Sequence, residues 1–202
     1  DILKDQEFTC ADGTKKNVDL MEATEREYLC GEKETGFRKA YKEGYSFVAL
    51  LPNEGIGIDD YVNQLDGAAF LKLMEEAQEE TVYTMLPAFE SETGFELSDT
   101  LKALGMPLAF DKDQAEFPGI FEESDVPVWI GRVLHKTHIC VDARGTKAGA
   151  ATVVEIMTES AAPQDPDEEP KEVYLDRPFV YAIVEDDTNL PVFIGTVEDI
   201  GK

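Results

Sequence analysis

Apolar residues along this chain recur mainly with the spacing of β-strands. The run at 45–51 is apolar almost throughout, so we expect this strand to be buried on both faces. Residues 1–36 are polar and charged and show only weak strand signals. The predicted strands are 37–41, 45–51, 81–91, 126–145, 173–185 and 190–199, with weaker signals at 7–10 and 17–21.

Helical spacing is confined to two regions. Residues 58–80 carry an apolar stripe, and Asp59 or Asp60 is placed to cap a helix there. A shorter helix is expected over 97–106, with Ser98 as its N-cap and Gly105 as its C-terminal stop. The order β, α, β, α and then mostly β predicts an α+β fold. The longer stripe consists of Tyr61, Leu65, Ala69, Leu73 and Ala77, widened by Phe70 and Met74.

Residues 146–157 follow the strand period but begin with small residues. One phase is uncharged and grows in size toward its end, whereas the other phase carries Lys147 and Glu155. One interpretation is a plain hairpin, with strands at 133–142 and 146–156 joined by the turn "DARG". The other is a segment that is a loop in one state and a strand in another, because small residues with weak propensities let both forms persist. The uncharged phase is Thr146, Ala148, Ala150, Thr152, Val154 and Ile156.

The charge of the chain argues against two classes of partner. The 202 residues include 43 acids and 18 bases, which gives a formal net charge of −25. No basic patch is left to meet the phosphates of a nucleic acid or an anionic membrane surface. No apolar run approaches the length of about 18 residues that a membrane helix needs. The acidic run 165–169 lacks the spacing of a calcium loop and is expected to be a solvated loop.

Few side chains suit catalysis or metal binding. The three cysteines, Cys10, Cys30 and Cys140, form neither a disulfide framework nor a Cys-x-x-Cys metal site, although one Cys10–Cys30 bridge stays open. The only histidines are His135 and His138, and no nucleophile elbow is present. We therefore expect no enzyme, no metal and no cofactor.

Two motifs carry a resemblance to a known family. Residues 133–155, "VLHKTHICVDARGTKAGAATVVE", and 173–183, "VYLDRPFVYAI", occur in order with "YSFVALLPNEG", "MLPAFESETGFELSDTLKALGM", "AFDKDQAEFPGI" and "LPVFIGTVED". This combination resembles the C-terminal half of a serpin, a serine protease inhibitor, and is closest in wording to serpins of gut bacteria. The resemblance covers essentially all 202 residues.

The resemblance implies a serpin fold, with several mainly antiparallel sheets and helices, of which only the C-terminal part is present. It also implies a suicide mechanism. A serine protease cleaves an exposed reactive-centre loop, here about 143–172, and the loop then inserts as a strand of the central sheet while the acyl-enzyme is trapped. The family's spacing puts the scissile bond at Glu159–Ser160, with Met157 and Thr158 as alternatives, so a glutamyl-, elastase- or chymotrypsin-type target stays open. The hinge would be Gly145, Thr146, Lys147, Ala148, Gly149, Ala150, Ala151 and Thr152.

The chain departs from the family pattern at three positions, one of which, Lys147, stands where an acid is common but lies on the outward phase. Ala143 and Ala88 stand where serpins usually carry a paired glutamate and lysine, and loss of both leaves no orphan charge. His135 matches a histidine beneath the sheet, in the region that parts during insertion, and is expected to be a hydrogen-bonded core residue.

The resemblance leaves alternatives for the whole protein. It implies secretion, and it implies that an N-terminal half, absent here, is needed for activity, so this chain alone is expected to be an inactive fragment. The alternative function is a non-inhibitory serpin that acts as a carrier, chaperone or structural protein.

Overall fold

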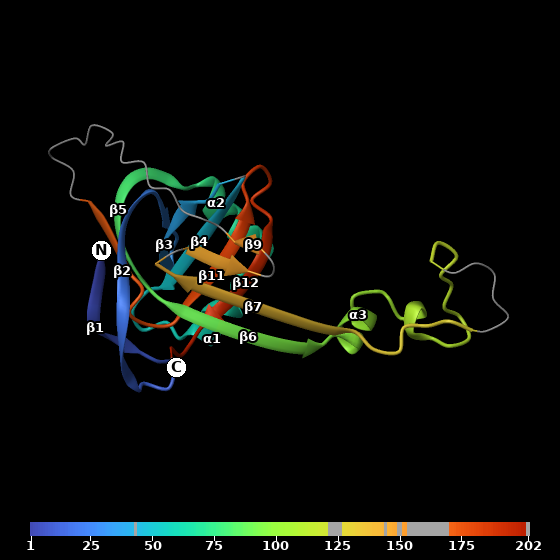
Figure 1. Ribbon diagram of the computed structural model, residues 1–202. Coiled ribbons are helices and arrows are strands. Elements are labelled where there is room, and N and C mark those ends of the chain that lie inside the picture. Colours follow the sequence, from blue (N-terminus) through green and yellow to red (C-terminus); the bar gives the residue numbers. More distant parts are fainter. Residues whose placement is uncertain (43, 121–126, 144, 149–150, 153–169, 201–202) are drawn as a thin grey trace. The chain divides into compact units, whose positions relative to one another are not determined.

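Strands make up most of the fold, as expected for an α+β chain, and short helices connect some of them (Figure 1). The structure is a computed structural model that describes residues 1–42, 44–120, 127–143, 145–148, 151–152 and 170–200. The elements are β1 Ile2–Thr9, β2 Lys15–Cys30, β3 Glu34–Ala40, β4 Tyr45–Pro52, α1 Ile58–Val62, α2 Gly67–Glu75, β5 Gln78–Pro87, β6 Phe89–Glu96, α3 Ser98–Ala103, the 3₁₀ turn η1 Leu108–Phe110, β7 Leu134–Asp142, β8 Gly145–Ala148, β9 Ala151–Thr152, β10 Lys171–Tyr174, β11 Phe179–Glu185 and β12 Pro191–Val197.

The chain divides into two units. Residues 1–90 and 140–202 form the first unit, and residues 91–139 form the second. The first unit contains an eight-stranded sheet in the order β10-β5-β2-β3-β4-β11-β12, with β1 paired to β2. Only the β10–β5 pair of this sheet is parallel. A second sheet has the order β6-β7-β8-β9.

The long strand β2 is the main feature that the apolar pattern underestimates. Its 16 residues pair with β1, β3 and β5 in turn. Many of its side chains are exposed, and charges on it are matched across strands, as in the 2.7 Å ion pair between Lys15 on β2 and Glu7 on β1. A strand whose polar residues face polar partners carries little apolar alternation, so residues 1–36 look unstructured by pattern alone.

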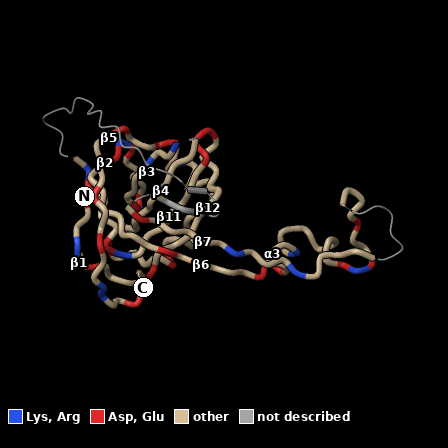
Figure 2. The backbone as a smooth tube through the Cα atoms, viewed as in Figure 1, with Lys and Arg blue, Asp and Glu red and all other residues tan. Residues whose placement is uncertain are grey.

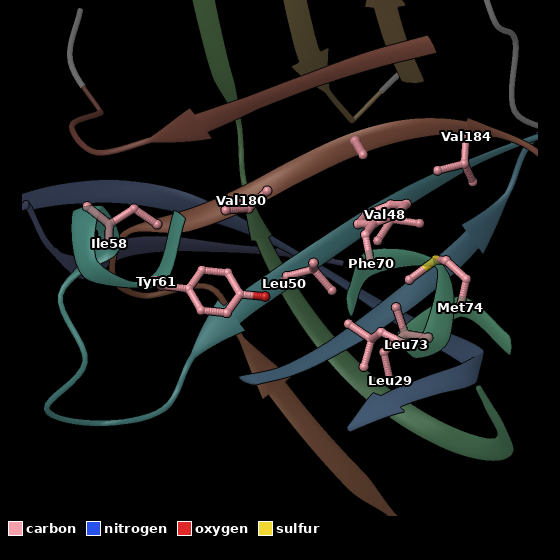
Figure 3. Packing of buried hydrophobic residues seen from close by; sticks show 11 residues of the cluster. Leu29, Val48, Leu50, Ile58, Tyr61, Phe70, Leu73, Met74, Val180 and Val184 are labelled. Atoms are coloured by element: carbon pink, nitrogen blue, oxygen red, sulfur yellow. The ribbon is translucent and has the colours of Figure 1, made fainter. Parts of the chain in front are cut away.

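Helices α1 and α2 cover one face of the sheet in the first unit. Strand β4 is buried at every position except Tyr45, which confirms burial on both faces. Figure 3 shows side chains of both helices packing against residues of β4 and β11. The buried cluster comprises Leu29, Val48, Leu50, Ile58, Tyr61, Phe70, Leu73, Met74, Val180, Ala182 and Val184.

The single helical region expected at 58–80 is two helices separated by a turn. Asp66 is the N-cap of α2, and its carboxylate accepts a hydrogen bond from the Ala69 backbone N–H at 2.8 Å. The prediction that Asp59 or Asp60 caps the first helix is wrong, because the N-cap of α1 is Gly57 with no side-chain hydrogen bond. The apolar period continues across the break, so the pattern did not reveal the cap inside it.

One buried polar atom in this core leads to a stability prediction. Tyr61 is 2% exposed, and its Oη has no hydrogen-bond partner among the described residues. Burial raises the pKa of Tyr61, so the phenol stays neutral at physiological pH. Tyr61→Phe should stabilise the full-length protein by about 1 kcal/mol, because it removes a buried, unsatisfied hydroxyl and keeps the ring. The midpoint of urea denaturation measures this, and a clear loss of stability would show that the hydroxyl has a partner.

The second unit is built around α3. The Ser98 hydroxyl donates to the carboxylate of Glu96 and accepts a hydrogen bond from the Val133 backbone N–H at 3.0 Å. Ser98 is therefore the first helical residue rather than the predicted N-cap, a role that falls to Leu97. Gly105 ends the helix with φ of +106°, as predicted.

Charges and cysteines add no further chemistry in the described residues. Figure 2 shows acidic residues on elements throughout the chain and fewer basic ones. All three cysteines are free, so the Cys10–Cys30 bridge is not formed; Cys10 is buried, and its Sγ lies 3.2 Å from Asp199 Oδ1. Within the described ranges, no group of three or more His, Cys, Asp or Glu side chains is placed to hold a metal ion. No described helix has the length and apolar character to cross a membrane.

Candidate functional site: the hinge after β7

Strand β7 leads directly into the predicted hinge. Ile139 and Val141, in its second half, are buried, whereas His135 is exposed. The neighbouring Cys140 and Asp142 are partly buried. Burial therefore alternates along the second half of the strand. The expected core position of His135 is not found in this chain, because the first half of β7 is exposed or only partly buried on both phases.

The hinge residues that the structure describes are in strand conformation. Strand β8, Gly145–Ala148, lies beside β7 in the second sheet and pairs with β9, Ala151–Thr152. The register matches Lys147 with Thr152 and Ala148 with Ala151. The hairpin interpretation thus holds for 145–148. Gly145 has φ of +125°, a conformation that L-residues with a side chain rarely adopt.

Several predicted site residues lie outside the part of the chain that the structure describes. These are the hinge residues Gly149 and Ala150, the scissile-bond candidates Met157, Thr158, Glu159 and Ser160, and the acidic run 165–169.

A cavity of about 310 Å³ in the first unit is lined both by the start of the hinge and by a charged pair. Ala143 and Gly145 line this cavity, as do Glu25 of β2 and Lys39 of β3. Lys39 Nζ donates a hydrogen bond to Glu25 Oε1 at 2.7 Å. Sequence reasoning missed this pair, because β2 gave only a weak strand signal and the two residues share a site only once β2 and β3 are paired. Aromatic residues Phe37, Tyr41 and Phe47 also line the cavity.

Strand β10 returns the chain to the large sheet after the predicted loop. It begins at Lys171, whose Nζ lies 3.3 Å from Glu80 Oε2 and 5.9 Å from the centre of the Tyr28 ring. Burial of Tyr28, with Cys30 beside it, raises its pKa to about 12, so the ring under Lys171 stays uncharged. Strand β10 lies at the edge of the sheet, and these contacts accompany its parallel pairing with β5.

The motif "VYLDRPFVYAI" joins β10 to the buried strand β11. Val173 and Leu175 are buried at the start of the motif, and Phe179 begins a strand with six consecutive buried residues. Between them, the Arg177 guanidinium pairs with Asp176 at 3.0 Å and donates to the Pro52 carbonyl at 3.1 Å. The apolar residues of the motif are therefore part of the core. Its charged residues, Asp176 and Arg177, stabilise the bend between β10 and β11.

Comparison with known proteins gives this arrangement a family. The family model described as "Serpin (serine protease inhibitor)" matches residues 2–200. A rice protein, Serpin-ZXA of Oryza sativa subsp. japonica, is 30% identical over 202 residues, covering 96% of this chain and 50% of its own. Alpha-1-antiproteinase of Rattus norvegicus is 31% identical over 152 residues, covering 75% of this chain and 34% of its own.

Solved structures agree with the family match. The thermophilic serpin Tengpin in its native state superposes with a TM-score of 0.80 at 40% identity, covering 98% of this chain and 50% of Tengpin. The chain thus spans about half the length of the first relatives that it matches. Because the family model matches almost every residue and a solved member superposes on the chain at 40% identity, the chain belongs to the serpin family.

Proposed function

We propose that the whole protein that contains this chain is a suicide inhibitor of serine proteases. In this proposal the segment 143–172 is the reactive-centre loop, and the protease cleaves it at Glu159–Ser160 or at a neighbouring bond. Cleavage frees the hinge, which inserts as a strand while the acyl-enzyme is still attached. In this proposal the chain supplies the loop that the protease cleaves and the strand that inserts, and it does not itself catalyse a reaction. Secretion is part of the same proposal.

The observation that carries this proposal is the composition of the hinge at the place where β8 begins. The phase of Thr146 and Ala148 is uncharged and small, and the backbone of these residues already forms a strand beside β7. A strand that enters a packed sheet must bury one face, and a charge there would be desolvated without a partner. The described hinge therefore suits a segment that has to become a buried strand. The rat relative's name, alpha-1-antiproteinase, agrees with an inhibitory role.

The alternative is a non-inhibitory serpin with the same fold. The residues of the uncharged phase that begins at Thr146 distinguish the two functions. A serpin that never inserts its loop is free to carry charged or bulky residues at these inward positions.

The proposal is tested with the full-length protein and four proteases, of the elastase, chymotrypsin, trypsin and glutamyl-specific types. Denaturing gels should show a covalent complex with at least one of them, and mass spectrometry of the released C-terminal peptide should place the cut at or next to Glu159. Cleavage by these enzymes with no complex at any ratio of inhibitor to protease would contradict inhibition and favour the non-inhibitory alternative.

A further inference from the structure

Arg38 of β3 joins the turn that follows β11 to the middle of the large sheet. Its guanidinium donates hydrogen bonds to Asp186 Oδ1 at 2.7 Å and to Asn189 Oδ1 at 3.1 Å. The Ser46 hydroxyl of β4 donates to the same Asp186 oxygen at 2.6 Å, and the Asp186 backbone N–H donates to the Gly44 carbonyl at 2.9 Å. Asp186 is therefore bound at three separate points outside its own hairpin. We call Arg38, Ser46, Asp186 and Asn189 the turn clasp.

Two members of the turn clasp are shielded from water. The Arg38 side chain is 12% exposed and Ser46 is 2% exposed, whereas the Asp186 side chain is 31% exposed. Hydrogen bonds to a charged group contribute more than neutral ones. Glu27 Oε2 of β2 also lies 3.5 Å from Arg38 Nε, so a carboxylate stays beside the guanidinium when Asp186 is replaced. A substitution at Asp186 therefore removes the link between the turn and the sheet, and it does not leave Arg38 without a counter-ion.

The turn clasp crosses the predicted cut at Glu159–Ser160. After that cut, residues 160–202 form a separate peptide that carries Asp186, whereas Arg38 stays in the larger fragment. Exposed ion pairs contribute little to the binding of two fragments. The Arg38–Asp186 pair is better shielded than two other ion pairs that join the same fragments, each of which has a partner at least 42% exposed; these are Lys16–Asp199 and Lys171–Glu80.

The cut changes what an opening of the turn clasp leads to. The C-terminal peptide supplies β11, which is buried at six consecutive positions and pairs with β4. While the chain is intact, an opened hairpin stays tethered and closes again, because its effective concentration beside β4 is high. Once the chain is cut, the contacts alone hold the peptide. Because Asp186 directly follows β11, the hairpin peels from β4 at its turn end only after the clasp has opened.

We propose that the turn clasp retains the C-terminal peptide in the cleaved protein, so that β4 and the core beside it stay covered while the hinge inserts. This inference rests on the proposed function, because cleavage of the loop creates the peptide. Apolar burial of β11 supplies the affinity of the peptide, and the clasp slows its release. Arg38 is thus a positioning residue whose effect is felt once the loop has been cut.

The test uses the full-length protein and its variants Arg38→Met, Asp186→Ala and Lys16→Met, each cut in the loop by a protease under native conditions. The first readout is the rate at which the C-terminal peptide leaves the cleaved protein in a fixed, sub-denaturing concentration of urea, followed by gel filtration and mass spectrometry. Arg38→Met and Asp186→Ala should each raise this rate by about tenfold or more, because a charge-assisted hydrogen bond is lost. A merely structural role of Arg38 would lower the melting temperature of the uncut protein and leave the release rate unchanged.

Lys16→Met is the matched control. It removes an ion pair that crosses the same cut but whose side chains are 38% and 61% exposed. Its release rate should stay within about twofold of wild type.

The second readout needs neither cleavage nor protease trapping. Hydrogen exchange of the Asp186 backbone amide in the uncut protein should be about tenfold faster in Arg38→Met than in wild type, and unchanged in Lys16→Met. Should Arg38→Met fail to fold, Arg38→Lys replaces it. Lysine keeps the charge but lacks the planar fork that reaches both acceptors, so it is expected to show a smaller effect of the same sign.

The outcomes separate this inference from the proposed function. Faster release and faster exchange in the Arg38 and Asp186 variants, with Lys16→Met like wild type, support the clasp. A wild-type protein that traps its protease, with equal release rates in all variants, overturns the clasp and leaves the inhibitory function standing. A wild-type protein that is cut without trapping any protease overturns the function, and the release rates, which require only the cut, then decide the role of the clasp by themselves.

Discussion

Thr146→Arg in the full-length protein is expected to abolish the covalent protease complex while cleavage of the loop continues. Thr146 is the first position of the uncharged phase, so insertion of the hinge would carry the new guanidinium into the sheet's interior. An uncompensated buried charge costs about 3–5 kcal/mol. At about 1.4 kcal/mol per tenfold change, the partition should shift toward plain cleavage by about a hundredfold or more. The measurement is the ratio of complex to cleaved inhibitor on denaturing gels.

A matched pair of alanines provides the control for this prediction. Ala148 and Ala151 are register partners in the β8–β9 pair, and partners in an antiparallel pair share one face of the sheet. In one continuous strand, the same positions are an odd number of residues apart and fall on opposite faces. Ala148→Arg and Ala151→Arg should therefore behave alike if β8 and β9 stay a hairpin. Loss of complex in Ala148→Arg alone would show that the hinge becomes one strand, whereas a stable complex in Thr146→Arg would refute the insertion mechanism.

The elements predicted well are those whose burial is set by one apolar pattern. Strands β4 and β11 were found because their apolar runs pack directly on neighbouring strands and helices. Strand β12 was found from its apolar residues too, although only Val197 of it is buried. Strand β2 was missed for most of its length, because pairing with three strands rather than burial makes it a strand. The helix break at Asp66 was missed because a cap is a local hydrogen bond that an apolar stripe does not record.

In the candidate site, too, local sequence patterns could be read from the sequence, whereas contacts made by strand pairing could not. The hinge could be proposed from the sequence because its two phases are local and lie within residues 146–157. The partly buried pair of Glu25 and Lys39 could not, because the two residues meet the hinge only through the pairing of β2 with β3 and the return of the chain at β7. His135 illustrates the opposite error. The family match predicted a core position, but its side chain is exposed in the described chain, because little covers the first half of β7.

Leu73→Ala is expected to lower the free energy of unfolding of the full-length protein by about 2–5 kcal/mol. Leu73 of α2 is 5% exposed and belongs to the cluster that joins the helices to β4 and β11. Truncating it removes buried methyl groups and leaves a cavity that the packed sheet below closes only in part. The midpoint of urea denaturation, followed by circular dichroism, measures the loss.

Leu71→Ala is the matched control, because it makes the same chemical change two residues earlier in the same helix. Leu71 is 41% exposed, so its truncation should cost about 1 kcal/mol or less. The change in helix propensity is the same for both variants and cancels in the comparison. The difference between them therefore measures packing against the sheet alone. Equal losses would mean that α2 does not dock through the face carrying Leu73, and the core in Figure 3 would be wrong at this helix.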